Sequence, residues 1–251
     1  MMFLLTLMMM LVEQAQAPSP PPPVPAPVQP LPPLPSTQLP GPQWNPVVDY
    51  VTPGQDEPGY RRWMAAQQWR PTLVASFHRY LNDAGVAFVV PTWQLLRTAS
   101  DWQRCGAEPF EVPPPEEWAN VVQTLRYVRD YVVPAVGPVE PVSVYRNPAL
   151  NDCAGGAPES VHKQLSAIDM VPLRPTSRPE MIRRLCAAHA SSGPRYSVGL
   201  GFYTKLRFHV DSWKYRTWGR DDHGELACDR STETYDDPVV AQGPVADTTK
   251  N

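Results

Sequence analysis

The sequence predicts an α+β domain in which a small, mainly antiparallel sheet is flanked by helices. Two observations support this class. Apolar residues recur at helical spacing in three segments, and short strand-like runs lie between and after those segments. Runs of strand separated by helices in this order indicate a small sheet covered by helices.

Each predicted helix carries an apolar stripe and a boundary residue. The first covers residues 71–84. The second covers residues 115–133 and is expected to stop at Pro134, because proline cannot continue a helix. The third covers residues 178–190 and is expected to end before Gly193.

Four short runs have the residue types and lengths of strands. They cover residues 142–145, 166–171, 198–203 and 206–210. Only Thr204-Lys205 separates the last two runs, so a tight hairpin is expected there.

Proline divides the chain of 251 residues, since 33 residues are proline and only 14 are glycine. Fourteen of the prolines lie between Pro18 and Pro46, a density that excludes a helix interior or a sheet and predicts an extended spacer. The predicted parts are a signal peptide at 1–17, a proline-rich disordered linker at 18–48, a domain at 49–222 and a mostly disordered polar tail at 223–251.

The first seventeen residues resemble a secretory signal. An apolar run from Met1 to Val12 is followed by Ala15-x-Ala17, a small-residue cleavage pattern, although the usual basic start is missing. Glu13 ends the run too early for a membrane span of about 20 residues. We therefore expect export to the periplasm or cell envelope, with no stable membrane span after cleavage. The net charge of -3 gives no basic footprint for nucleic acid.

Export makes disulfides the expected state of the four cysteines. No CxxC pair is present to suggest a thiolate zinc site. Of the three pairings, the hypothesis favoured here joins Cys105 to Cys153 and Cys186 to Cys228, because the second bond would fasten the polar tail to the third helix.

Polar residues with metal-binding chemistry lie on two of the predicted strands. Strand alternation places His209 and Asp211 on one face with Arg207, and Asp169 follows His162 by seven positions. Two imidazoles and one carboxylate are a common catalytic zinc set. Spacing alone leaves open the alternative that His162 is a hydrogen-bonded structural histidine.

The surrounding motifs favour the metal site. Ser143-Val144-Tyr145-Arg146 precedes Ser160-Val161-His162, then Asp169, and the region ends in His209-Val210-Asp211 before Trp218-Gly219. This order, over residues 95–219, resembles the zinc D-alanyl-D-alanine carboxypeptidase and murein endopeptidase family. The resemblance implies a hedgehog/D-Ala-D-Ala-peptidase-like fold. It also implies that His162, Asp169 and His209 bind Zn²⁺, and that Arg146 binds a substrate carboxylate or the developing oxyanion.

Two positions depart from the family pattern. The carboxypeptidase branch has a glutamate base three residues before the last histidine, where this chain has Leu206. Asp211 is the nearest acidic residue that could act as the base. The equal alternative is that Asp211 holds the imidazole of His209 in place by a hydrogen bond. The glycine expected three residues after His162 is Leu165, whose side chain is expected to narrow the cleft.

Other polar residues have weaker roles. Ser160 and Asn151 match the family pattern and would order the loop before His162, with turn capping as the alternative. Tyr203 and Trp213 flank the site and are candidates for substrate contact, and Glu159 is a candidate acid. His78 and His189 are expected to serve packing or helix-terminus roles.

Together these features predict an exported zinc peptidase that hydrolyses an amide in the stem or crosslink peptides of peptidoglycan. The alternative is a catalytically inactive wall-binding or structural domain that keeps the fold. The sequence leaves open carboxypeptidase or endopeptidase action and DD or LD stereochemistry. A monomer is assumed.

Overall fold

The structure is a computed structural model that describes residues 44–229. The predicted signal peptide, most of the linker and most of the tail therefore lie outside the described residues. Within residues 44–229, no helix has both the length and the apolar composition needed to cross a bilayer.

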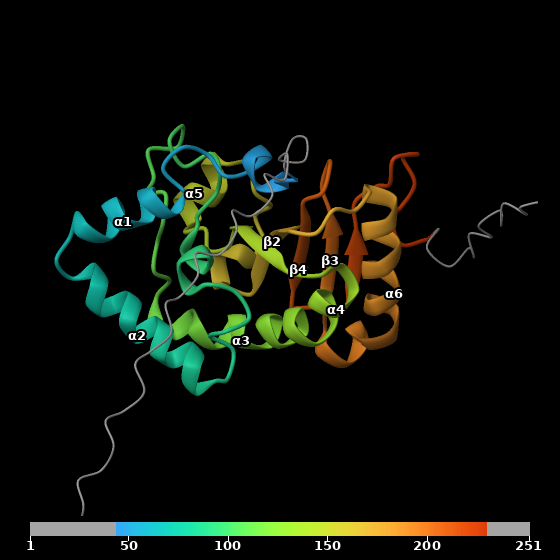
Figure 1. Ribbon diagram of the computed structural model, residues 1–251, viewed down its shortest axis with the longest axis horizontal. Helices are drawn as coiled ribbons and strands as arrows, with labels where there is room; N and C mark the ends of the chain where they lie inside the picture. Colours follow the sequence, from blue (N-terminus) through green and yellow to red (C-terminus); the bar gives the residue numbers. More distant parts are fainter. Residues whose placement is uncertain (1–43, 230–251) are drawn as a thin grey trace, which may run out of the picture. The chain divides into compact units, whose positions relative to one another are not determined.

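A five-stranded sheet forms the centre of the domain, in the order β1-β2-β4-β3-β5 (Figure 1). Its strands are β1 (Val139–Ser143), β2 (Ala167–Pro172), β3 (Gly199–Phe202), β4 (Phe208–Asp211) and β5 (Arg216–Trp218). Neighbours pair antiparallel except β3 and β5, which are parallel. The α+β class is confirmed, and the sheet is mixed because of β5, which the sequence did not predict.

Residues 44–229 form six α-helices and several short 3-10 segments. The α-helices are α1 (Glu57–Ala65), α2 (Arg70–Asp83), α3 (Trp118–Tyr127), α4 (Val133–Val136), α5 (Pro148–Cys153) and α6 (Arg178–Tyr196). The 3-10 segments are η1 (Pro46–Asp49), η2 (Thr92–Leu96), η3 (Pro115–Glu117) and η5 (Val161–Gln164). Figure 1 shows α2, α3 and α4 following one another along one side of the domain, with α6 beside β3. Among the tertiary contacts are those of α3 with β2 and of α6 with β3.

The end predicted for the second helix is wrong. A π-helical turn, η4 (Val128–Val132), follows α3, and the chain continues through Pro134 into α4. Proline removes one amide donor, and Pro134 lies in the first turn of α4, directly after the π turn, where regular α-helical bonding is already interrupted. The helical run instead ends at Gly137, whose φ of 83° suits glycine.

The third helix also extends further than predicted. α6 runs to Tyr196 through Gly193 and Pro194, and it ends at Ser197 with a left-handed φ of 52°. A Cβ at Gly193 would lie 2.8 Å from the His189 ring and 2.9 Å from Tyr215. Gly193 is therefore a packing position inside the helix rather than its end.

The two faces of the sheet differ in polarity, as alternation along the strands predicts. One face is apolar and buried, and its fully enclosed side chains include Ile168, Met170, Leu200, Phe208 and Val210. Burying each such side chain stabilises the fold by roughly 1.5–3 kcal/mol. The opposite face carries the polar residues.

The hairpin between β3 and β4 is longer than predicted. The amide of Tyr203 donates to the carbonyl of Arg207 at 3.1 Å, which leaves a three-residue loop of Thr204, Lys205 and Leu206. Lys205 adopts a left-handed φ of 58°, as is typical of three-residue hairpin loops. Leu206 thus lies in the loop, half-buried against the core, and not in a strand.

Both predicted disulfides are confirmed, with Cys105 bonded to Cys153 and Cys186 to Cys228. The first bond lies at the end of α5, and the second joins α6 to the segment after β5. Two disulfides are consistent with folding in an oxidising compartment.

Replacing both Cys186 and Cys228 by serine should lower the free energy of unfolding by about 2–4 kcal/mol, because the bond closes a loop with a sequence separation of 42. Urea unfolding followed by tryptophan fluorescence measures this loss. The matched control, Cys105 and Cys153 to serine, opens a loop with a separation of 48 and should cost a similar amount. A change below about 0.5 kcal/mol for the first pair would contradict the expectation.

Candidate metal centre

The site is built on a row of residues that crosses the polar face of the sheet. Strand register aligns Ser143 of β1, Asp169 of β2, His209 of β4, Gly201 of β3 and Trp218 of β5. Paired residues point to the same face. Two predicted ligands, separated by 40 positions in the chain, are therefore direct cross-strand neighbours.

A second row lies one step further along the strands. It contains Asp211 of β4, Gly199 of β3 and Arg216 of β5. A Cβ at Gly199 would lie 2.2 Å from the Asp211 carboxylate, and one at Gly201 would lie 2.0 Å from the Trp218 ring. The glycines of β3 leave the space that these large side chains occupy.

His162 reaches the same place from the 3-10 segment η5, which precedes β2. Leu165, three residues after His162, ends this segment in a left-handed conformation with φ of 54°. The amide of Arg146 donates to the carbonyl of His162 at 3.2 Å, which ties η5 to the loop after β1.

The three predicted ligands form one compact, buried cluster. A donor atom from each of His162, Asp169 and His209 lies within 4.8 Å of the others. Asp169 Oδ1 is 3.3 Å from His162 Nε2 and 2.9 Å from His209 Nδ1. All three side chains are at most 5% exposed. This buried His-Asp-His group could hold a metal ion.

The hydrogen bonds around the imidazoles turn one ring nitrogen of each histidine toward Asp169. His162 Nδ1 donates to the carbonyl of Val144 at 2.6 Å, so its Nε2 carries a lone pair, which is buried and has no partner among the described residues. His209 Nε2 donates to the Asp211 carboxylate at 2.9 Å, which turns Nδ1 toward Asp169. Such outer hydrogen bonds typically orient metal-ligating histidines.

The electrostatics suit a cation at this point. Burial lowers the pKa of His162 to about 4, and the charge of Arg146 acts in the same direction, so the imidazole is neutral at pH 7. Burial alone would raise the pKa of Asp169, yet His162, His209 and Arg146 hold it well below its usual range. Burial lowers the pKa of His209, but its hydrogen bonds to the two neighbouring carboxylates give a net increase. A cation at Nδ1 would replace the proton favoured there.

Asp211 is enclosed on the side of His209 away from Asp169. Oδ2 accepts from His209 and from Arg216 at 2.8 Å, and Oδ1 accepts from Arg216 at 3.1 Å and from the amide of Trp213 at 2.9 Å. Burial raises its pKa, but these partners lower it to about 2. The carboxylate is ionised and fully bonded, which suits the role of fixing His209.

Arg146 and Tyr203 each contact one oxygen of the Asp169 carboxylate. Arg146 donates from Nη2 to Oδ2 at 2.6 Å and from Nε to Ser143 at 3.0 Å. The hydroxyl of Tyr203 donates to Oδ1 at 3.2 Å. Burial, followed by the charge of Asp169, raises the pKa of Tyr203, so it remains a donor at neutral pH.

A cleft of about 530 Å³ opens over the cluster. One wall is the loop between α5 and η5, and the other comes from β4, β5 and the hairpin. Its lining residues include Arg146, Glu159, Ser160, His162, Tyr203, Arg207, His209, Arg216 and Trp218. The structure thus brings together the predicted ligands, Arg146, Ser160 and Tyr203.

The expected effect of Leu165 on the cleft is wrong. Its side chain is fully buried in the hydrophobic core and is not among the residues that line the cleft. The left-handed φ of 54° explains why glycine is favoured at this position, since a side chain there costs about 1–2 kcal/mol. Core burial of Leu165 offsets that strain.

The loop residues order the wall of the cleft. Asn151 is buried and donates to the carbonyl of Ala157 at 3.1 Å, as expected for a residue that organises the loop. Ser160 precedes η5 but makes no side-chain capping bond, so the capping alternative is wrong. Glu159 is exposed and lines the cleft.

The remaining histidines and Trp213 lie elsewhere. His78 bonds Thr92 at 2.8 Å on the surface, while His189 bonds the carbonyl of Val198 at 2.8 Å and stacks on Tyr215. His189 has the packing role that was expected, whereas His78 is exposed in the middle of α2 and has neither a packing nor a helix-terminus role. Trp213 is 61% exposed and does not line the cleft.

Sequence reasoning missed the functional placement of Arg216 and Trp218. Both belong to β5, and they reach the site only because β5 pairs parallel to β3. Trp218 contacts His209, with ring centroids 5.4 Å apart. The sequence carried one usable signal, the Trp218-Gly219 pair of the terminal motif.

The fold and site define an α+β protein with a buried candidate metal centre at the base of a cleft. Comparisons with protein-family models, with curated proteins and with solved structures found no significant match to this chain. The family resemblance of the motifs stays a prediction.

The wild-type protein should bind about one divalent transition-metal ion per chain, and His162→Ala should abolish stoichiometric binding because it removes one of three protein ligands. Equilibrium dialysis with elemental analysis measures the metal content. His78→Ala, outside the cluster, is the matched control and should bind metal as the wild type does. Full metal content in the His162 variant would exclude this centre.

Proposed function

We propose that the protein is an exported zinc peptidase that hydrolyses an amide bond in the stem or crosslink peptides of peptidoglycan. The observation that carries the proposal is the convergence of His162, Asp169 and His209 into one buried group beneath a cleft. These are the residues that the motif resemblance assigns to zinc. The two disulfides fit a protein that works outside the cytoplasm.

Zinc is the metal that the donor set favours. Two imidazole nitrogens and one carboxylate oxygen match common catalytic zinc sites, which keep a further position open. In the neutral imidazole, His162 Nε2 has a lone pair and no hydrogen, and it lies 3.3 Å from the Asp169 carboxylate. A cation between these two electron-rich atoms would stabilise the contact. A bound zinc ion supplies an activated water of pKa near ~7 and polarises the scissile carbonyl.

Arg146 and Tyr203 would orient the substrate beside the ligands. Arg146 lines the cleft and is held by hydrogen bonds to Ser143 and Asp169. Its planar guanidinium is therefore already in position before a substrate binds. Tyr203 keeps its proton, which it donates to Asp169 and could donate to a substrate carbonyl oxygen instead. Both groups would stabilise negative charge that develops on that oxygen.

Glu159 is the better candidate to accept the proton of the attacking water. Asp211 has no free oxygen, since both atoms are bonded to His209, Arg216 or the Trp213 amide. Among residues 44–229, Glu159 is the one carboxylate that lines the cleft, and it is exposed. We therefore assign Asp211 to positioning His209 and Glu159 to proton transfer.

Purified mature protein with zinc should hydrolyse muropeptides, releasing D-alanine or splitting crosslinked stems. Chelation and His162→Ala should each abolish hydrolysis, because both remove the activated water. Liquid chromatography with mass spectrometry of digested peptidoglycan detects the products. Adding zinc back should restore hydrolysis by the chelated wild-type protein but not by the His162→Ala variant.

The absence of glutamate at Leu206 favours a second function, an inactive wall-binding domain that keeps the metal. Stoichiometric zinc with no cleavage of any muropeptide, combined with sedimentation on purified peptidoglycan, would support this second function over catalysis.

Two variants that replace a carboxylate by the amide of the same size separate the roles of Glu159 and Asp211. Glu159→Gln should retain zinc and lower turnover by about 10²–10⁴-fold, the usual contribution of a general base. Asp211→Asn should weaken zinc affinity by about 10–100-fold, and saturating zinc should restore most turnover. Zinc titration and initial rates measure both effects, with Glu116→Gln as a surface control. Lost turnover at full zinc occupancy in the Asp211 variant would instead make Asp211 the base.

A further inference from the structure

Three arginines line the cleft, and their charges are compensated differently. Arg146 is paired with Asp169 at 2.6 Å, and Arg216 is paired with Asp211 at 2.8 Å. Arg207 makes no ion pair with any residue from 44 to 229, and its Nε is buried without a hydrogen-bond partner in that part of the chain. Arg207 is thus an uncompensated cation beside the candidate metal centre.

Aromatic contacts hold Arg207 in place. Its guanidinium carbon lies 3.7 Å from the centroid of the Tyr203 ring and 6.0 Å from that of Tyr50. The hydroxyl of Tyr50 accepts from the Arg207 amide at 3.2 Å. A guanidinium stacked on a ring keeps its planar edge available for two hydrogen bonds to a carboxylate.

The cation lies at a defined distance from the ligands. Arg207 precedes His209 by two positions and lines the same cleft, and two strand residues span about 7 Å. Tyr203, on which Arg207 stacks, also reaches Asp169 with its hydroxyl. An anion held by Arg207 would therefore be about two residues of extended chain from the metal centre.

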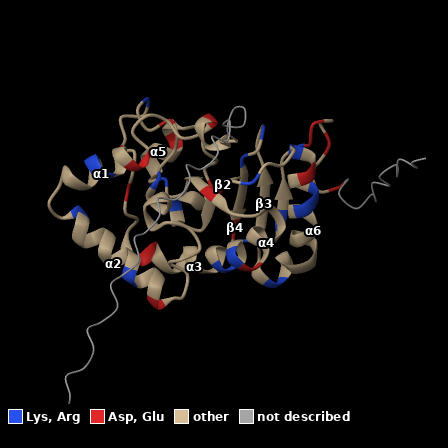
Figure 2. Ribbon diagram, viewed as in Figure 1, with Lys and Arg blue, Asp and Glu red and all other residues tan. Residues whose placement is uncertain are grey.

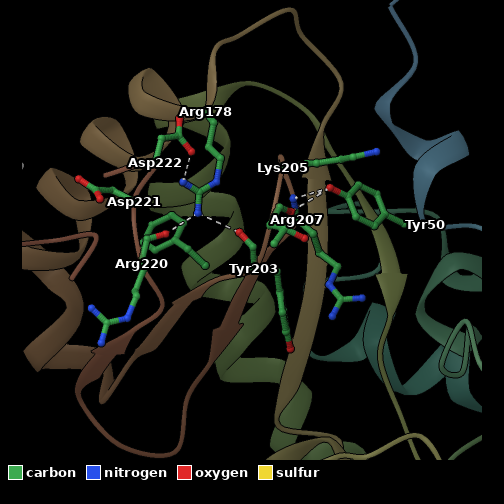
Figure 3. Close-up of a pocket in the computed structure, with 10 residues that line it drawn as sticks. Tyr50, Arg178, Tyr203, Lys205, Arg207, Arg220, Asp221 and Asp222 are labelled. Atoms are coloured by element: carbon green, nitrogen blue, oxygen red, sulfur yellow. Dashed lines mark hydrogen bonds and ion pairs between the residues drawn. The ribbon is translucent and has the colours of Figure 1, made fainter. Parts of the chain in front are cut away.

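Arg207 and Arg220 also line the neighbouring pocket, and two of its other basic residues are paired with carboxylates (Figure 3). Arg178 pairs with Asp222 at 2.7 Å, and Lys205 pairs with Asp49 at 3.1 Å. Figure 3 shows the side chains of Tyr203 and Arg207 extending in one direction, away from Arg178. The charge distribution along the ribbon is likewise mixed, with both signs on α6 (Figure 2). Arg207 therefore differs from Arg146 and Arg216 in having no ion pair among residues 44–229, and from Arg220 in lining the cleft over the metal centre.

We infer that Arg207 anchors a carboxylate of the bound peptide, so that the cleft selects peptides with a carboxylate within about two residues of the cleaved amide. This inference rests on the proposed function for the place of the cleaved bond. Binding of the carboxylate itself depends only on the cleft and its uncompensated cation.

The test compares acetyl-lysyl-D-alanyl-D-alanine with its C-terminal carboxamide. Calorimetric titration of the zinc-loaded protein should give about 10–100-fold tighter binding of the carboxylate, as expected for a charge-assisted hydrogen-bonded pair. Arg207→Gln should reduce that preference about tenfold with zinc content unchanged. Arg207→Lys, which keeps charge but loses the planar stack, should give an intermediate preference.

Lys205→Gln is the matched control, since it removes the same charge two residues away and outside the metal cleft. It should leave the preference unchanged. Equal binding of the two peptides by the wild type, no binding of either, an unchanged preference in Arg207→Gln, or an equal loss in Lys205→Gln would each overturn the inference. Thermal unfolding of each variant confirms that it is folded.

Cleavage is recorded in the same samples. If the wild type prefers the carboxylate and Arg207→Gln does not, yet no peptide or muropeptide is cleaved, the anchor stands and the proposed hydrolysis fails.

Discussion

The site depends on the antiparallel register of β2 and β4, which sets Asp169 opposite His209. Strand side chains alternate between faces, so a slip of one residue would turn Asp169 into the apolar layer and bring Ile168 or Met170 to the metal cluster. The apolar face prevents that slip, because Ile168 and Val210 are fully buried on it. Core packing therefore fixes the positions of the candidate ligands Asp169 and His209 and also stabilises the domain.

The same register places two carboxylates where water cannot reach them. Asp169 and Asp211 are 0% exposed, and an isolated buried charge is strongly destabilising. Each carboxylate has an arginine within 2.8 Å, and His209 lies between the two carboxylates and contacts both. Such networks contribute little net stability when compared with apolar packing. Their effect here is to fix the tautomer and orientation of His209, which a metal ligand requires.

Local motifs predicted the ligands, whereas tertiary pairing decided their surroundings. His162, Asp169 and His209 were identifiable from short motifs that are local in the sequence, although the three residues lie in η5, β2 and β4. Arg216 was not, since its contact with Asp211 requires the parallel pairing of β5 with β3.

Local rules failed where neighbouring structure overrode them. Pro134 did not stop the helix, because a π turn directly precedes α4. The prediction for Leu165 was wrong because the backbone there is left-handed, and this conformation sets the direction of the side chain. A sequence indicates a left-handed backbone when the residue is glycine, but not when it is leucine.

The two walls of the cleft are restrained in different ways, and this difference bears on selectivity. The wall from β4, β5 and the hairpin is part of the sheet, so Arg207 and the ligands keep a fixed separation. The opposite wall, between Ala154 and Val161, is a loop held at its start by the Cys105–Cys153 bond and by Asn151. Glu159 lies on this second wall. A group on a loop can approach the substrate after it binds, while an anchor on the sheet can select the substrate before that approach. In the proposed roles, recognition by Arg207 would belong to the sheet and proton transfer by Glu159 to the loop.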